Sequence, residues 1–312
     1  MNNEIVEKKS NVFVFLIEFI RIRGVVIWSM ISLVGFVLGM TSLKLSSYLV
    51  PLLTLIVSTF CILSFTFAIN NYYDADSDRE NPRRKHINAI ASGKISKKTS
   101  IFLNVAFVSI SLLISLIYRL EVLLFCVLLI FWMWVYSSPP IRLKGRPGLD
   151  IIWHFFAFVL LTLWGSLISG SIGIISWLVA ISFGMWSLIA QVWNHISDYS
   201  YDKDNKTITF AVWTGIDTAK TTLKMTVILH VIFLFPLIIF YSLSYLSTII
   251  ILIGGLIFTL VFIKPKKDFP ISPKYHIPFV FACVVYLNCV IYHICTLLEE
   301  PTIRFLSFTS LF

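Results

Sequence analysis

Long apolar blocks limit what this chain can fold into more than any other feature. Hydrophobic residues make up 58% of the 312 residues and charged residues only 13%, and the mean hydropathy is +0.88. The apolar blocks have the length of helices that cross a bilayer, which is about 20 residues. We therefore predict an all-α, polytopic membrane protein with about nine membrane-spanning helices. These are expected at residues 25–43, 47–70, 99–118, 121–137, 151–171, 173–194, 223–242, 245–263 and 276–297.

The placement of the basic residues agrees with this number of spans. All but three of the 25 Lys and Arg residues fall on one side of the membrane, the exceptions being Lys44, Arg119 and Arg304. Because basic loops remain in the cytoplasm, we expect a cytoplasmic N-terminus and an outside C-terminus in the plasma membrane. Residues 1–20 lack the apolar core and cleavage site of a signal peptide, so they are predicted to be a cytoplasmic N-terminal segment.

The net charge of +9 is therefore expected mainly on the cytoplasmic face. Orientation in the membrane and attraction to anionic lipids explain most of it. No soluble domain carries this charge, so nucleic acid is not an expected partner. The five cysteines all fall inside predicted spans without a CxxC pair, which favours a packing role. The connections are short, so residues 1–312 are predicted to form a single integral-membrane domain.

Two short acidic clusters directly follow predicted spans. In the first, Asp74 and Asp78 are four residues apart, and Asn70 lies one turn earlier on the same face of a continuing helix. The second contains Asp198 and Asp202 at the same spacing. Carboxylates grouped in this way repel one another unless a cation lies between them. Mg²⁺ prefers hard oxygen ligands and bridges carboxylates to phosphate oxygens. We predict that the two clusters face each other and bind a diphosphate through magnesium; a solvated helix end is the alternative for the first.

The positions of the clusters indicate a duplicated plan. The first follows the second predicted helix and the second follows the sixth, so each opens the cytoplasmic loop of a four-helix half. The predicted architecture is therefore two four-helix halves plus one further helix. The longer, charged connections all lie at the cytoplasmic end, which is the predicted functional end.

Further polar residues adjoin these clusters. Asn194 and His195 precede the second cluster, and polar groups at membrane depth are candidates for function. A structural role is the alternative for His195. After the fourth span, the segment from Tyr136 to Lys144 contains two prolines that end the helix and set Arg142 and Lys144 towards the site. These two cations are placed to neutralise a leaving diphosphate; ordinary cytoplasmic loop charge is the alternative.

Taken together, these residues resemble the UbiA superfamily of intramembrane prenyltransferases. The first motif of that family, NxxxDxxxD, is met by Asn70, Asp74 and Asp78, and the second, DxxxD, by Asp198 and Asp202. Both follow the expected helices, and the resemblance covers nearly the whole chain. It implies an all-helical bundle with a lateral opening to the bilayer and a cytoplasmic cap.

The resemblance also implies a reaction. Magnesium binds a prenyl diphosphate, and Asn70 assists. The metal is held by the catalytic residues, which are Asp74, Asp78, Asp198 and Asp202. Departure of the diphosphate leaves an allylic cation, and the metal and Arg142 or Lys144 screen the developing charge. A lipophilic acceptor then captures the cation, while the surrounding helices exclude water.

Two segments depart from the family pattern. Many members carry an NRPxxSG-like segment, whereas residues 87–93 here read INAIASG, so we expect the phosphate contacts to shift to Arg83 or Arg84. Tyr136 is followed by SSPPIRLK in place of the YxxxK segment of quinone-pathway members. This string resembles the branch that contains chlorophyll synthases and lycopene elongases. It favours a polyisoprenoid or carotenoid-type acceptor over 4-hydroxybenzoate, while a quinone-precursor or lipid acceptor stays an alternative.

Three other classes of membrane protein share part of this pattern. A UbiA-like membrane terpene cyclase shares the metal site and stays an alternative within the fold. A membrane transporter places ionisable residues near the middle of the bilayer, whereas the acidic residues here lie at one face. A CDP-alcohol phosphotransferase needs a contiguous acidic and glycine motif that neither cluster offers.

Overall fold

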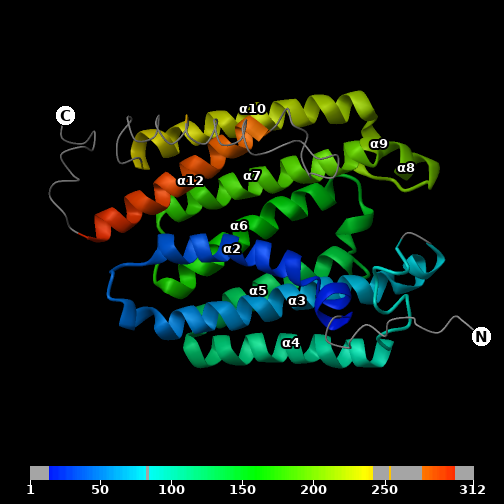
Figure 1. The fold of residues 1–312 in the computed structure, drawn as a ribbon, viewed down its shortest axis with the longest axis horizontal. Coiled ribbons are helices and arrows are strands. Elements are labelled where there is room, and N and C mark those ends of the chain that lie inside the picture. Colours follow the sequence, from blue (N-terminus) through cyan, green and yellow to red (C-terminus); the bar gives the residue numbers. More distant parts are fainter. Residues whose placement is uncertain (1–13, 82–83, 242–252, 254–275, 299–312) are drawn as a thin grey trace, which may run out of the picture. The chain divides into compact units, whose positions relative to one another are not determined.

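The computed structural model describes residues 14–81, 84–241, 253 and 276–298, and all regular secondary structure within them is helical (Figure 1). The long helices are α2 (Ile22–Gly39), α3 (Leu49–Glu80), α4 (Lys97–Tyr118), α5 (Leu120–Ser137), α6 (Leu149–Ser169), α7 (Ile174–Ser197), α10 (Ile216–Tyr241) and α12 (His276–Leu297). Short helical segments are η1 (Val14–Phe19), η2 (Leu45–Tyr48), η3 (Leu143–Gly145), α8 (Tyr199–Asp204) and α9 (Phe210–Thr214).

The predicted all-α membrane fold is confirmed for this part of the chain. Seven of the described helices are long and apolar enough to cross a membrane, and an eighth, shorter apolar helix covers Phe281–Leu297. Each corresponds to a predicted span. The remaining predicted span, at 245–263, lies outside the described residues, so the total of nine and the cytoplasmic cap stay predictions.

Helix α3 carries the first acidic motif, and its predicted helical extension is confirmed. The sequence predicted a span that ends at residue 70 and an acidic helical extension beyond it, and α3 runs without interruption to Glu80. At the other end of the chain, α10 begins at Ile216, before its predicted start at residue 223. The predicted N-terminal segment also contains structure, because η1 folds there and Phe19 and Ile20 are fully buried.

The chain divides into two compact units. The first comprises Met1–Met30 and Leu53–Leu143, and the second comprises Ile31–Leu52 and Lys144–Phe312. The division after Leu143 follows α5, where the first predicted four-helix half ends. Helices α2 and α3 each pass from one unit to the other. Each unit has its own hydrophobic core, and the single domain predicted for residues 1–312 stays a prediction.

In the first unit, α3 and the paired helices α4 and α5 surround a core that includes Phe65, Ala68 and Phe107. The buried side of α4 carries several small or polar residues at helical spacing. They are Ser100, Asn104, Ser111 and Ser115. Small residues of this kind allow membrane helices to approach closely, because lipid offers no hydrophobic force between them.

In the second unit, α7 packs against both α6 and α10, and α12 packs against α10 (Figure 1). The 31–39 part of α2 lies directly on α6, where Ser166 Oγ donates to the Gly35 carbonyl oxygen at 2.7 Å. A Cβ atom on Gly165 would overlap the backbone at Ser32, and one on Gly35 would overlap the backbone at Thr162. Glycine is therefore required at both positions for this packing.

A buried polar cluster joins three helices of the second unit. Ser182 Oγ on α7 lies 2.9 Å from His230 Nε2 on α10 and 2.8 Å from Tyr286 Oη on α12. The His230 Nε2 and Tyr286 Oη atoms are 3.2 Å apart. Such hydrogen bonds stabilise the packing of membrane helices, because no water is present in the bilayer core to serve as an alternative partner for the polar groups.

Candidate active site

The first acidic motif lies on the extension of α3 with two of its carboxylates turned inward. Asp74 and Asp78 are only 5% and 6% exposed. Asp76, between them in sequence, has a side chain that is 70% exposed, and its Oδ2 accepts from Lys97 Nζ at 2.8 Å. The two buried carboxylates are thus on one face, one turn apart, as their spacing predicts.

Arg142 reaches this face from the loop after α5. Its Nη2 donates to Asp74 Oδ1 at 3.2 Å, and its side chain remains 44% exposed. The backbone turns at this point, since the Arg142 N–H donates to the Ser138 carbonyl oxygen at 2.9 Å and Arg142 has a φ of 40°. One of the two predicted loop cations is therefore brought to the first motif. Lys144 lies in η3, in the second unit.

Asn70 and Tyr136 both lie in the first unit. Asn70 Nδ2 donates to Ser137 Oγ at 2.9 Å, which ties α3 to the end of α5. Tyr136, one residue earlier on α5, is within electrostatic reach of the Arg21 guanidinium. These contacts place both predicted residues around the first motif.

The loop after α3 is held by Asn88, which sequence reasoning named only as part of an unusual segment. Asn88 is fully enclosed, and its Nδ2 donates to Asp78 Oδ2 at 3.0 Å and to the Asn71 carbonyl oxygen at 2.9 Å. Its Oδ1 accepts from the backbone N–H groups of Ile90 and Ala91. Asn88 therefore fixes the loop to one of the two buried carboxylates. Among the predicted loop arginines, Arg84 is exposed, and Arg83 lies outside the described residues.

Arg21 is a further cation near the first motif, and sequence reasoning did not single it out. Its Nη2 donates to Asn71 Oδ1 at 2.8 Å, while Asn71 Nδ2 donates to the carbonyl oxygens of Glu18 and Phe19. Burial lowers the pKa of the Arg21 guanidinium, and the negative charges of Asp74 and Asp78 act in the opposite direction. A second cation therefore lies in the field of the first motif. In sequence it was only one of many cytoplasmic basic residues.

The second motif lies where α7 meets α8. Asp198 ends α7 and is exposed, whereas Asp202 on α8 is buried. The Asp202 N–H donates to the Asp198 carbonyl oxygen at 2.8 Å, so the two aspartates remain one turn apart across the junction. Asn194 is exposed one turn before Asp198, whose N–H donates to the Asn194 carbonyl oxygen at 2.9 Å.

His195, the other predicted residue of this region, forms a buried pair with Asp150. The distance from His195 Nε2 to Asp150 Oδ2 is 3.0 Å, and Gln191 Nε2 lies 3.1 Å from the same ring nitrogen. His154, one turn after Asp150 on α6, is within electrostatic reach of both partners. The sequence did not indicate Asp150, because a single acidic residue in the first turn of a helix is a common capping feature.

The donor chemistry of the two motifs suits magnesium. Among the described residues, no three His, Cys, Asp or Glu side chains gather as a metal site. The carboxylates of Asp74, Asp78, Asp198 and Asp202 are nevertheless the hard oxygen donors that Mg²⁺ prefers. Arg142 and Arg21 add the positive charge that a diphosphate bound beside the first pair would need.

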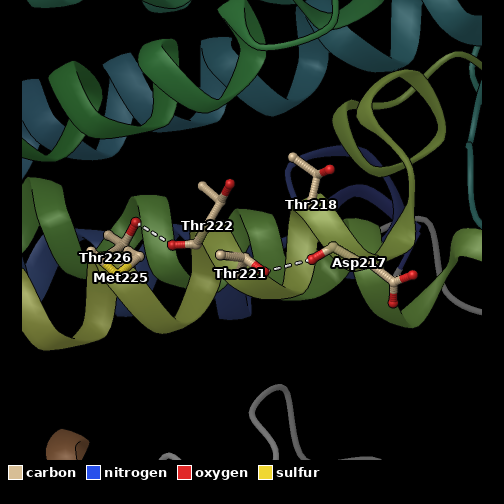
Figure 2. A pocket seen from close by; sticks show the side chains of 6 residues that line it. All are labelled: Asp217, Thr218, Thr221, Thr222, Met225 and Thr226. Atoms are coloured by element: carbon tan, nitrogen blue, oxygen red, sulfur yellow. Dashed lines mark hydrogen bonds between the residues drawn. The ribbon is translucent and has the colours of Figure 1, made fainter.

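Two surface hollows have none of these four aspartates in their linings. One of about 370 Å³ is formed by α3, α4 and α5 and is lined by residues that include Tyr72, Asn104 and Trp134. The other, of about 480 Å³, runs along α10 (Figure 2). Its lining residues are Asp217, Thr218, Thr221, Thr222, Met225 and Thr226. Two of its threonine hydroxyls donate to carbonyl oxygens of the same helix, so they are directed towards their own backbone.

Solved structures share this fold. A UbiA homologue from Archaeoglobus fulgidus bound to GPP and Mg²⁺ matches with a TM-score of 0.64 and 22% identity, over 91% of this chain and 99% of that one. A digeranylgeranylglyceryl phosphate synthase matches with a TM-score of 0.66 and 18% identity over the same shares. At such identities the likeness establishes the architecture.

Helical membrane architecture and paired acidic motifs define the class to which this protein belongs. Residues 28–285 match the model of the UbiA prenyltransferase family, so the chain is a member of that family. A lycopene elongase/hydratase from Corynebacterium glutamicum is 26% identical over 176 residues, which is 53% of this chain and 58% of the relative. The match thus spans little more than half the length of that curated relative.

Proposed function

We propose that this protein transfers a prenyl group from a prenyl diphosphate to a lipophilic acceptor in a Mg²⁺-dependent reaction that passes through an allylic carbocation. The observation that carries this proposal is the buried pair Asp74 and Asp78, with Arg142 bound to Asp74 on the extension of α3. Buried carboxylates with a half-exposed arginine beside them suit a metal–diphosphate headgroup better than they suit a solvated helix end.

In this proposal Asp74, Asp78, Asp198 and Asp202 hold the metal. Bound Mg²⁺ would neutralise the diphosphate and stabilise it as a leaving group. Arg142 contacts Asp74 through one nitrogen, and a guanidinium has five donors, so others remain to bind diphosphate oxygens. Asn88 orients Asp78 through its amide. Asn70, Arg83, Arg84, Tyr136, Lys144 and Asn194 complete the proposed substrate-binding residues, and a role for His195 is developed below.

The acceptor is proposed to be a linear polyisoprenoid of the carotenoid type. The name of the curated relative, lycopene elongase/hydratase, supports this class. Structures of the Archaeoglobus fulgidus homologue bound to GPP and Mg²⁺ and to DMAPP and Mg²⁺ support an allylic diphosphate as the donor. Both substrates carry apolar chains, which suits an enzyme surrounded by membrane lipids. We propose that it lies in the plasma membrane with its N-terminus cytoplasmic and its C-terminus outside.

The test is a product analysis with purified protein in liposomes. Dimethylallyl and geranyl diphosphate would each be supplied with Mg²⁺ and with lycopene, 4-hydroxybenzoate or geranylgeranylglyceryl phosphate. We expect Mg²⁺-dependent diphosphate release and transfer to lycopene. A cyclised product formed without an acceptor would identify a terpene cyclase instead. Folded protein that releases no diphosphate from either donor would overturn the proposal and favour transport.

A further inference from the structure

The pair of Asp150 and His195 has chemistry that diphosphate binding does not use. Asp150 stands in the first turn of α6 and His195 in the last turn of α7, and both side chains are more than nine-tenths buried. Asp150 Oδ2 lies 3.0 Å from His195 Nε2, and because an ionised carboxylate can only accept, the ring tautomer that satisfies this contact has its proton on Nε2. The lone pair of the imidazole is then on Nδ1.

This lone pair is left unused. Within the described residues, His195 Nδ1 and Asp150 Oδ1 are both buried and have no hydrogen-bond partner. A buried polar atom without a hydrogen-bond partner is unfavourable, because it has lost its contact with water. A purely structural role, in which the pair only joins α6 to α7, would explain the contact at Nε2. An acidic residue at a helix start and a basic residue at a helix end both interact favourably with the helix dipole. A structural role of this kind would not explain why His195 Nδ1 is buried without a hydrogen-bond partner.

The position of His195 links it to the proposed reaction. His195 precedes Asp198 by three residues on α7, so the two side chains lie within one turn of the same helix end. His154, from the adjacent α6, brings a second imidazole to the pair. A carboxylate that fixes one ring nitrogen while the other is free is the arrangement by which proteins orient a general base.

We propose, resting on the function proposed above, that His195 is the general base that ends the reaction and that Asp150 is its positioning residue. When C1 of the allylic cation bonds to an alkene carbon of the acceptor, the positive charge moves to the neighbouring carbon. A C–H bond next to that carbon then breaks. Its electron pair forms the new double bond, and its proton passes to His195 Nδ1.

Asp150 stabilises the imidazolium that results, and the proton is later released to water. The net products are the elongated alkene, diphosphate and one proton. A cation that loses no C–H proton is instead captured by a water molecule, and loss of an O–H proton from that oxygen to further water yields a tertiary alcohol. The ratio of alkene to alcohol therefore reports the base directly.

The experiment measures diphosphate release and product identity separately, with dimethylallyl diphosphate, Mg²⁺ and lycopene in liposomes. His195→Gln keeps a polar side chain but removes the basic nitrogen, and Asp150→Asn removes the charge that fixes the ring. The products are scored per diphosphate released, so the comparison does not require either variant to keep the wild-type rate. The ratio of alkene to alcohol should fall by about 100-fold for His195→Gln, the lower range of general-base effects, and less for Asp150→Asn. His230→Gln, a matched change at another buried histidine, should keep the wild-type ratio.

An unchanged product ratio in His195→Gln would overturn the inference, at whatever rate that variant releases diphosphate. Absence of diphosphate release from the wild-type protein would instead count against the proposed function. A second measurement does not depend on turnover or on the folding of a variant. In wild-type protein with ¹⁵N-labelled histidine in nanodiscs, NMR should show His195 protonated at Nε2 and not at Nδ1. The opposite tautomer would overturn the inference.

Discussion

Arg142 Nη2 lies 3.2 Å from Asp74 Oδ1, although 68 residues separate the two along the chain. The contact joins the loop after α5 to the extension of α3. A buried carboxylate needs such a partner, because desolvation of an unpaired charge is costly. In the proposed function the same guanidinium serves the free protein as a counter-ion and the bound diphosphate as a donor.

Replacement of Arg142 should weaken substrate binding. Arg142→Ala removes charge-assisted hydrogen bonds of about 1.5–3 kcal/mol, so we expect KM for the prenyl diphosphate to rise by about 10- to 100-fold. Arg142→Lys should recover only part of the loss, because lysine lacks the planar fork. Steady-state kinetics would measure this, with exposed Lys98→Ala as the control. The same KM in Arg142→Ala and wild type would contradict the proposed contact.

Asn88 should affect magnesium use through Asp78. Asn88→Ala removes the donor to Asp78 Oδ2 and the acceptor for two backbone N–H groups of the loop. We expect the Mg²⁺ concentration for half-maximal activity to rise by about 10-fold, which corresponds to about 1.4 kcal/mol, and excess Mg²⁺ to restore part of the rate. Titration of activity with Mg²⁺ measures the effect. Ser92→Ala, in the same loop, is the control, and equal Mg²⁺ requirements for the two variants would argue against this role.

The glycine contact between α2 and α6 should be sensitive to a single methyl group. In Gly165→Ala the new Cβ meets the backbone at Ser32, which cannot move as a side chain can. Overpacking of this kind costs about 1–3 kcal/mol. We expect a lower Tm in detergent, while Gly173→Ala, whose Cβ has open space around it, should match the wild type. Equal Tm values for the two variants would contradict the close approach.

The polar cluster on α7, α10 and α12 should contribute to the stability of the fold and not to catalysis. Tyr286→Phe removes the contact with Ser182 Oγ at 2.8 Å. Interhelical hydrogen bonds in membranes are worth about 0.6–2 kcal/mol. We therefore expect a modestly lower Tm and an unchanged kcat for the folded fraction. Tyr292→Phe on the same helix is the matched control, and a kcat loss specific to Tyr286→Phe would assign the cluster a role in the reaction.

The sequence predicted the elements well where one local property decides them. Apolar blocks of spanning length correspond to eight helices, because burial in lipid requires both the composition and the length. The spacing of Asp74 and Asp78 predicted one shared face, and α3 continues through both, with Asp76 paired to Lys97 on the exposed side. The length of the apolar blocks predicted the helices, and the residue spacing predicted the shared face.

The residues that contact the predicted site residues could not be predicted from the sequence, because these contacts form only in the tertiary structure. Arg21 looked like an orienting charge, and only its contact with Asn71, 50 residues away, sets it apart. Asp150 had no local signal that distinguished it from a capping residue. Ser182, His230 and Tyr286 are single polar residues in three different spans, and their cluster exists only once the helices pack.

The most direct test of the central claim is Mg²⁺-dependent diphosphate release from dimethylallyl diphosphate by the wild-type protein, Asp74→Asn and Asp76→Asn. The two variants make the same change two residues apart on α3, at a buried and an exposed position. We expect release by the wild type and by Asp76→Asn, and a loss of about 100-fold or more in Asp74→Asn, with all three proteins extracted and folded alike. Wild-type release by Asp74→Asn, or release that does not require Mg²⁺, would contradict the account.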